Sequence, residues 1–520
     1  MELLDSATIV VKSIAYTLGL YLVLFASYRL TLHPLSSYPG PVAAKLSDLY
    51  NLYHATLMNE HLATWRSHQS YGSVVRHGPN KLVFNSLEAL QDIYYNDRVS
   101  KSNVYLNILQ APNVHSVFTV IDKRQHRIKR RLIGQALNER GMRLFEPIIL
   151  EQVDIFIQQM SQSCQSNEPI NMTPPLRYLT LDIICLLAFG FPLNTQEMAE
   201  YRFVSDGIVA GTYFQNMKLQ CPLLTQLRMT EALQFLRNVR GRREPYRRIV
   251  KMLIGSRMAE ASDAKQDLYS MVAHELDTGG PDNVQTSGLW AEAIFIFAAG
   301  GDTTATVIAA LFFYLSRNPE CYAKLAHEIR TTFESSSEIR SGPKLTSCRY
   351  LRACIDEALR MSPPAPGTPW REQSEMDNAP FIVDGHVIPR GTHVGVNVYS
   401  ILHNEKHFPD PFIYKPERWL ATLPEAQTKI MHDAFIPFSA GPRICAGKAM
   451  AYLETSLVIA KTFWHFDFEK AAGKPGELGA GSSGGIFGRH RTSEFQLYEM
   501  ISSTHDGPNL LLNPRVGISR

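Results

Sequence analysis

A single cysteine, Cys445, stands where a tight loop meets a predicted helix in the stretch FIPFSAGPRICAGKAMAYLE, residues 435–454. Gly441 and Pro442 favour a turn, and the residues after Gly447 are good helix formers. The first N–H groups and the positive end of a helix stabilise an anion, so the loop favours a thiolate at this position. A metal ligand, a reactive nucleophile and an inert thiol are all compatible with that description.

The neighbours of Cys445 narrow the chemistry. Gly447 has no side chain, so a large flat group can approach the backbone there. Phe438 can shield one side of the sulfur, and Arg443 can pair with carboxylates on the same flat group. A haem, with its planar ring and two propionates, meets these demands. A buried inert cysteine explains the loop equally well when the loop is taken alone.

A second stretch, AIFIFAAGGDTTATVIAALFFYLS at residues 293–316, is apolar except for Asp302. An aspartate near the centre of a membrane span costs roughly 2.5–3.5 kcal/mol. Two glycines and two threonines beside Asp302 indicate a helix with a local defect. We therefore predict a buried core helix here rather than a second membrane span.

Other motif matches do not carry function. GAGSSG (479–484) has the spacing of a dinucleotide-binding turn, and GSSGG (481–485) has that of a nucleophile elbow. Neither lies between a strand and a helix, as both mechanisms require, so we predict a flexible loop. His403 and His407 are four residues apart, but FPDPF follows at once, and we predict surface histidines in a turn.

Bulk composition limits the class of protein. The 520 residues are 45% hydrophobic and 19% charged, with a formal net charge of +3. This is a globular composition, and the charge balance does not indicate nucleic acid as a partner. The 7 cysteines are scattered without a CxxC pair. A disulfide framework or a tetrahedral zinc site is therefore not expected, and a reducing compartment fits.

The N-terminus predicts a membrane anchor. Residues 7–28 are apolar except for Lys12, which can snorkel to the headgroups, and a bilayer span takes about 20 residues. Glu2 and Asp5 argue against a cleaved signal peptide. We assign residues 1–33 to the anchor, 34–45 to a proline-rich linker and 46–520 to one catalytic domain. Within that domain the patterns favour a mainly α fold with small β-sheets, including a strand near Lys81 and a hairpin within 381–399.

Four motifs in a fixed order resemble those of one family. FSAGPRICAG (438–447) matches the haem-binding signature FxxGxRxCxG of the cytochrome P450 family. AGGDTT (299–304) is similar to its oxygen-activating motif, EALR (357–360) to its ExxR pair and PERW (416–419) to its PERF motif. SYPGP (37–41) resembles the hinge after the anchor. The resemblance covers essentially the whole chain, and its details look most like fungal microsomal members of secondary metabolism.

The resemblance implies a role for each matching residue. Cys445 would be the axial thiolate ligand of the haem iron, and Asp302 with Thr303 the acid–alcohol pair that delivers protons on the opposite side. Gly300 and Gly301 would leave room for the ring. The remaining cofactor-binding and supporting residues implied in this way are Phe438, Gly441, Arg443, Gly447, Arg371, His126 (at a position where the family has tryptophan) and Arg130, with Glu357, Arg360 and Arg418 as a structural charge network.

Partners and cofactors follow from the same resemblance. The cofactors would be haem b and NADPH, the latter acting through a separate NADPH–cytochrome P450 reductase, with cytochrome b5 as an optional second donor. The catalytic domain would be cytosolic, behind a single-pass anchor in the endoplasmic reticulum membrane. The reductase would dock on a basic helix that carries Lys123, Arg124, Arg127, Lys129 and Arg131, although a merely solvated helix face explains these residues equally well.

The implied reaction is insertion of one oxygen atom from O2 into a hydrophobic small molecule, such as a terpenoid or polyketide-derived natural-product intermediate. An isomerase or dehydratase that uses no external oxygen and a non-enzymatic haem sensor are the alternatives. By family position, substrate contacts are expected from residues 103–118, 203–214, 294–298, 365–369 and 485–487.

Overall fold

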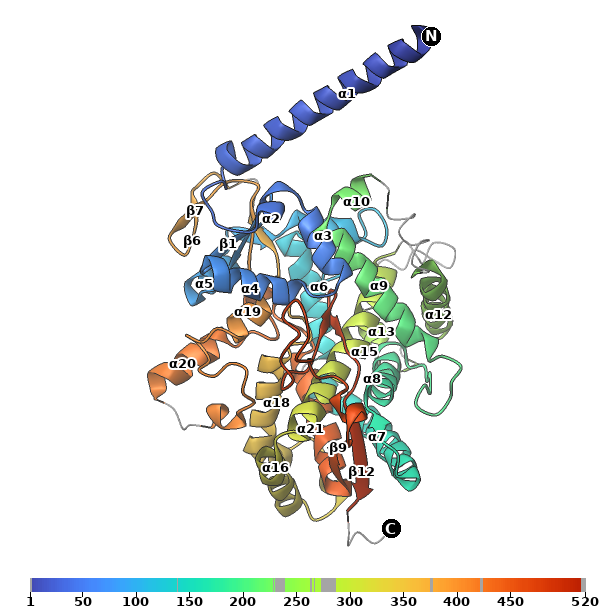
Figure 1. Cartoon of the computed structure of the whole chain (residues 1–520). Helices are drawn as coiled ribbons and strands as arrows, with labels where there is room; N and C mark the ends of the chain where they lie inside the picture. Colours follow the sequence, from blue (N-terminus) through green and yellow to red (C-terminus); the bar gives the residue numbers. More distant parts are fainter. Residues whose placement is uncertain are drawn as a thin grey trace.

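A 28-residue helix, α15 (Gly288–Leu315), runs through the middle of the molecule (Figure 1). In this computed structural model, the described residues are 2–137, 139–227, 229, 239–261, 264–265, 267–272, 287–374, 377–420 and 424–515. The side chain of Ser287 caps α15 by accepting a hydrogen bond from the Trp290 N–H at 3.1 Å. Most of α15 is buried, which confirms the predicted core helix.

The helices that pack around α15 form the larger part of the body. Those in direct contact with it include α8 (Thr173–Phe189), α9 (Phe203–Gln220), α12 (Val239–Ala259), α16 (Pro319–Thr332), α18 (Arg349–Met361) and α21 (Lys448–His465). The others are α2 (Val42–Leu46), α3 (Leu49–Thr56), α4 (Glu60–Tyr71), α5 (Leu87–Tyr94), α6 (Lys123–Ala136), α7 (Glu139–Ser163), α10 (Leu223–Gln226), α13 (Leu268–Val272), α17 (Pro343–Ser347), α19 (Val398–Leu402) and α20 (Glu425–Ala434). One continuous apolar core lies among α7, α8, α15, α18 and α21.

The sheets are small, as the sequence predicts. A five-stranded sheet has the order β1-β2-β8-β5-β3, built from β1 (Val74–Gly78), β2 (Lys81–Phe84), β8 (His393–Val396), β5 (Arg371–Gln373) and β3 (Val99–Lys101). The expected strand near Lys81 and hairpin β6 (Phe381–Val383)–β7 (His386–Ile388) are confirmed. The remaining strands are β4 (Ile170–Asn171), β12 (Asn509–Pro514) and β9 (Phe466–Lys470) in one sheet, and β10 (Tyr498–Glu499) with β11 (Ser503–Thr504) in another.

The N-terminal helix α1 (Glu2–Ser27) projects away from the body and continues as one π-helical stretch, Tyr28–Leu32 (Figure 1). It is long and apolar enough to cross a membrane, and the spanning window is not buried against other residues. The linker that follows lies on the sheet. The Arg76 guanidinium donates to the carbonyls of Arg29 at 2.9 Å and Leu35 at 3.3 Å. The segment that follows α1 is therefore fixed to β1 at Arg29 and Leu35.

Two histidines depart from the prediction of a surface turn. His403 and His407 are both buried. The ring of His403 stacks on Tyr399 with centroids 3.9 Å apart and on Phe412 at 5.0 Å. Burial holds the pKa of His403 well below its ordinary value, so the ring is neutral and packs as an aromatic group.

Candidate active site

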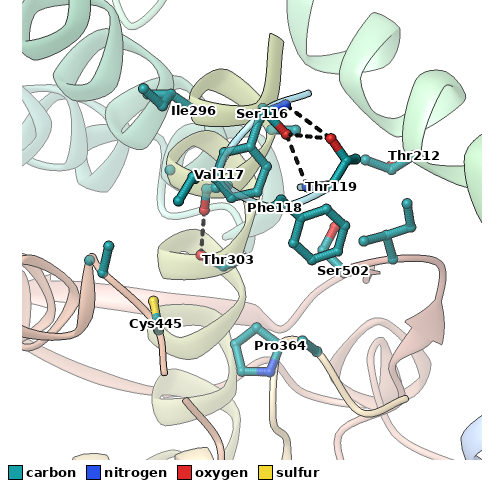
Figure 2. Close-up of a pocket in the computed structure, with 18 of the residues that line it drawn as sticks. Ser116, Val117, Phe118, Thr119, Thr212, Ile296, Thr303, Pro364, Cys445 and Ser502 are labelled. Atoms are coloured by element: carbon teal, nitrogen blue, oxygen red, sulfur yellow. Dashed lines mark hydrogen bonds between the residues drawn. The ribbon is translucent and has the colours of Figure 1, made fainter. Parts of the chain in front are cut away.

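A cavity of about 470 Å³ lies between α15 and the loop that carries Cys445. Figure 2 shows Thr303 on α15 and Cys445 on the loop, both beside this space. Apolar side chains from several elements form much of its wall. Among them, the rings of Phe118 and Phe295 stack with centroids 5.3 Å apart. The cavity therefore joins the Cys445 sulfur, the Thr303 hydroxyl and an extended apolar surface.

The loop before α21 holds Cys445 in place through its backbone. The Cys445 N–H donates to the Phe438 carbonyl at 2.9 Å. Gly441 has φ +67°, and an added Cβ would lie 2.0 Å from the Tyr94 carbonyl oxygen, so no other residue fits there. Cys445 is exposed and lines the cavity. Burial raises the pKa of the thiol, while the N–H groups of Gly447 and Lys448 and the Arg130 guanidinium oppose that rise.

Gly447 tests whether a flat cofactor fits beside the sulfur. An added Cβ would meet no atom of the chain within 4 Å, and its φ of −84° is open to any residue. The backbone therefore gives no reason for glycine, whereas a ring lying against the loop does. Phe438 also borders the cavity, and its ring lies 5.3 Å from that of Tyr452. These residues fit a haem whose iron the Cys445 thiolate would hold.

A cluster of basic side chains borders the cavity on the α6 side, and this cluster is defined by Lys101, His126, Arg130, Arg371 and Arg443. Within the described part of the chain, no carboxylate pairs with any of them; their hydrogen bonds go to carbonyls instead. Arg443 donates to Val120 O at 2.7 Å and Ile121 O at 2.9 Å. Such a cluster is suited to two carboxylates of a bound group, as haem propionates would supply.

Burial, and after it the neighbouring arginines, lowers the pKa of two members of this cluster. Burial, followed by Arg443 and Arg130, lowers the pKa of His126 to about 3. Burial and the two arginines Arg371 and Arg443 hold the pKa of Lys101 well below its ordinary value. A bound dianion would offset these effects. Lys101 is a member that the sequence did not single out, because one lysine in a short strand carries no motif.

The opposite wall carries the acid and alcohol of α15. The Thr303 hydroxyl faces the cavity and donates to the Ala299 carbonyl at 2.6 Å. Asp302 does not border the cavity. Its carboxylate lies 3.5 Å from Arg177 Nε and accepts from the Ser502 hydroxyl at 3.3 Å, and Ser502 does border the cavity. Burial raises the pKa of Asp302, and Arg177 opposes this.

The two glycines of α15 have different surroundings. An added Cβ at Gly300 would lie 2.6 Å from Ile184 Cγ1 of α8, so the bare face of Gly300 permits close packing of α8. An added Cβ at Gly301 would make ordinary contacts with Ile208 and Leu181 at 3.6 and 3.7 Å. Gly300 lines the cavity, and Gly301 is not among the lining residues, so room for a ring stays a prediction. The helix α15 is continuous, and the expected local defect is not seen; Thr180 Oγ1 donates to the Gly301 carbonyl at 2.9 Å.

Glu357, Arg360 and Arg418 come together as a buried network beside the cysteine loop. Glu357 accepts from Arg360 at 2.9 and 3.0 Å and from Arg418 Nε at 3.0 Å. Trp419 Nε1 donates to the same carboxylate at 3.0 Å, and its ring lies 4.6 Å from that of Phe435, where the loop begins. Burial alone would raise the pKa of Glu357, but Arg360 and Arg418 hold it below its ordinary value.

A second buried carboxyl, Glu454, was missed at the level of sequence. It lies on α21, and the Thr304 side chain is hydrogen-bonded to it, while its Oε1 has no partner in the described residues. Burial raises its pKa to about 8. A lone glutamate within the apolar run MAYLETSLV is the only signal that the sequence offers.

Most of the segments expected to contact substrate border the cavity. Members of 103–118, 203–214, 294–298 and 365–369 are all in its wall. The prediction for 485–487 is wrong, because Phe487 packs against Tyr53 at 6.3 Å and His54 at 6.4 Å instead. The residues that take this place are Glu499–Ser502, at the β10–β11 turn. A further correction concerns Lys129, which pairs with Glu292 at 2.9 Å and so does not face outward.

Comparison with known proteins agrees with this geometry. Residues 45–482 match the family model described as Cytochrome P450. The chain belongs to the cytochrome P450 family. It is 35% identical over 480 residues to cytochrome P450 monooxygenase poxM of Penicillium oxalicum, covering 91% of each chain. It is 34% identical to cytochrome P450 monooxygenase AKT7 of Alternaria alternata, covering 94% of each. It is 33% identical to cytochrome P450 monooxygenase apf7 of Gibberella fujikuroi, covering 95% of this chain and 96% of that protein.

This P450 is thus a haem-thiolate monooxygenase with the mainly helical fold that the motifs imply. The assignment of individual site residues rests on the geometry above. One cavity is lined or shaped by most of the predicted site residues, namely Cys445, Phe438, Gly441, Arg443, Gly447, Arg371, His126, Arg130 and Thr303. Asp302 lies behind the wall that α15 forms. The network of Glu357, Arg360 and Arg418 lies beside the cysteine loop.

Proposed function

We propose that this P450 inserts one oxygen atom into an uncharged lipophilic natural-product intermediate while anchored in the endoplasmic reticulum membrane. The observation that supports this proposal most is the placement of the Cys445 sulfur and the Thr303 hydroxyl beside one largely apolar cavity, with the cluster of basic side chains at its α6 side. The family membership supports the reaction class, and the fungal relatives support the natural-product context.

The residues around the cofactor would have two functions, to ligate the iron and to bind the propionates. Cys445 would hold the iron, and Arg371, Arg443, Lys101, His126 and Arg130 would take the propionates. Haem ligated by a thiolate supplies the activation of O2, because the sulfur donates electron density that favours O–O cleavage. Arg130 also donates to the Ile444 carbonyl at 2.6 Å and the Cys445 carbonyl at 3.3 Å. It would therefore hold both the cysteine loop and the haem propionates.

Proton delivery would come from the wall of α15. The Thr303 hydroxyl is fixed by Ala299 and faces the cavity, so it can hold a proton donor in place there. Asp302 is sealed behind the wall but is linked to the cavity through the Ser502 hydroxyl. Because burial favours its protonated form, Asp302 can hold a proton and pass it through Ser502.

Electrons would come from NADPH through a separate reductase. The exposed basic residues Lys123, Arg124, Arg127 and Arg131 lie on α6, whose opposite side carries His126 and Arg130. A reductase with an acidic surface is complementary to this face. Cytochrome b5 would use the same face. The exposed helix α1 would place the body against the cytosolic side of the membrane, where lipophilic substrates collect.

The test uses full-length protein in nanodiscs with a P450 reductase. Cys445→Ala is expected to lose the ferrous carbonyl absorption of a thiolate-ligated haem, while the control Cys164→Ala, at a half-buried thiol on another helix end, retains it. A panel of terpenoids and polyketide-derived compounds is then incubated under ¹⁸O2. One ¹⁸O atom in an NADPH-dependent product supports the proposal. Products formed without NADPH and without ¹⁸O would indicate an isomerase or dehydratase. An unchanged ferrous carbonyl spectrum in Cys445→Ala would refute the assignment of Cys445 as the haem ligand.

A further inference from the structure

A glutamate at the β10–β11 turn, Glu499, borders the cavity although its side chain is only 2% exposed. Its position is fixed from one side. Oε2 accepts from the backbone N–H of His61 and lies 3.0 Å from the ring atom Nδ1 of the same residue. Burial holds the pKa of His61 well below its ordinary value, so that ring is neutral. The backbone N–H and the ring of His61 therefore both hold Oε2 in place.

The other carboxyl oxygen, Oε1, has no hydrogen-bond partner among the described residues. It points at Gly367, which also borders the cavity. An added Cβ at Gly367 would lie 2.5 Å from Oε1 and 3.6 Å from the carboxyl carbon, with no other atom within 4 Å. The glycine thus leaves space that only this carboxyl uses. Since Oε2 is bonded to the backbone N–H and the ring of His61, Oε1 is the carboxyl oxygen that is left for a ligand.

The surroundings favour an uncharged ligand group. Burial raises the pKa of Glu499 to about 8, while the His61 N–H, His77 and Arg489 act in the opposite direction. Most molecules therefore carry a neutral carboxyl near pH 7. A hydroxyl both donates and accepts, so it matches such a group in either protonation state. No hydrogen bond from the described residues occupies Oε1, and Glu499 lines the cavity, so a ligand hydroxyl can take this position.

We propose that Glu499 Oε1 binds a hydroxyl group of an otherwise apolar substrate, and that Gly367 keeps the space in which this contact forms. The contact would determine specificity in two ways. It selects substrates that carry a hydroxyl group, and it holds the hydroxyl end at Glu499, so that the other end of the molecule lies away from Glu499. It rests on the proposed function in that the cavity must hold haem. It names the substrate class as lipophilic alcohols rather than plain hydrocarbons.

The experiment compares two probes of equal heavy-atom number, 1-octanol and n-nonane. Each is titrated into the haem-loaded full-length protein, and the dissociation constant is read from the spin-state change of the ferric haem. The variants are Glu499→Leu, which removes the carboxyl, Glu499→Gln, which keeps a donor and an acceptor, and Gly367→Ala, which displaces Oε1 without changing Glu499. Ile501→Val, at an apolar neighbour in the same cavity wall, is the matched control.

The ratio of the two dissociation constants is the measured quantity, because folding and haem content affect both probes equally. In Glu499→Leu and Gly367→Ala the preference for 1-octanol is expected to fall roughly tenfold, the usual effect of one hydrogen bond to a buried group. Glu499→Gln is expected to retain part of it, and Ile501→Val all of it. An unchanged ratio in both Glu499→Leu and Gly367→Ala overturns the proposal, as does tighter binding of octyltrimethylammonium than of 1-octanol. A normal ferrous carbonyl spectrum in the same samples shows that such a failure leaves the monooxygenase assignment intact.

Discussion

Removal of the Glu357 carboxylate should destabilise the protein far more than loss of an ordinary ion pair. Glu357 accepts five hydrogen bonds, from Arg360 Nε and Nη2, Arg418 Nε, the Lys415 N–H and Trp419 Nε1, at 2.9–3.0 Å. Glu357 and Arg360 have side chains with no exposed surface, and that of Arg418 is 3% exposed. In Glu357→Ala two guanidinium groups would remain buried without a counter-charge.

The expected loss is about 3–5 kcal/mol, the usual cost of removing one partner from a buried pair. Domains have a free energy of unfolding of about 5–15 kcal/mol, so this is a large share of the total. The loss should also reach the cofactor, because Trp419 packs on Phe435 at the start of the cysteine loop. Glu357→Ala is therefore expected to show both a lower denaturation midpoint and a lower haem content.

The measurement is urea denaturation followed by circular dichroism, together with the haem-to-protein ratio after purification. Glu338→Gln provides the control, since Glu338 forms an exposed pair with Lys344 at 2.8 Å and its loss should change neither readout. Glu357→Gln keeps the shape and some hydrogen bonds and should fall between the two. A Glu357→Ala protein within about 1 kcal/mol of the wild type would show that the buried arginines find other partners and would refute the reasoning.

Three other variants test separate parts of the site. Thr303→Ala should keep haem but direct a larger share of NADPH consumption to hydrogen peroxide, measured as peroxide per NADPH; unchanged coupling would argue against proton delivery from Thr303. Gly447→Val should lower haem content with little change in far-ultraviolet circular dichroism, because an added side chain meets no atom of the chain; full haem loading would contradict the proposed ring position. Glu454, whose pKa burial raises to about 8 from 4.5, binds its proton more tightly in the folded state. Stability should therefore fall as pH rises from about 4.5 to 8, by at most about 1.4 kcal/mol per pH unit, and this fall should be smaller in Glu454→Gln.

Local patterns in the sequence were sufficient for the parts of the site that a single segment builds. The turn at Gly441, the thiol at the start of α21 and the polar interruption of α15 each depend on adjacent residues, and all three are found in the structure. The fold class followed from helix-like periodicity and short strands. The network around Glu357 was placed by the family resemblance, and its geometry is present.

Most of the parts that failed depend on residues distant in sequence. Nothing near Lys129 indicates its pairing with Glu292. His403 is an exception, because the rings that enclose it, Tyr399 and Phe412, are close in sequence, and the turn residues of FPDPF favoured a surface position instead. The β10–β11 turn has strands of two residues each, too short to show periodicity, so Glu499 could not be placed at the cavity. The contact between the bare face of Gly300 and Ile184 of α8 could not be placed either, because sequence does not tell which partner a helix packs against.

The helix α6 joins two surfaces that would otherwise be remote from each other. Arg130 on its inner side is bonded to the carbonyls of Ile444 and Cys445, and its outer side is exposed and basic. A redox partner docked on the outer side would be separated from the axial ligand by little more than one helix, whose diameter is about 10 Å. The electron's route would then be short and mostly along covalent and hydrogen bonds. Charge-reversing changes on the outer side would slow reduction of the iron without altering which molecules the cavity accepts.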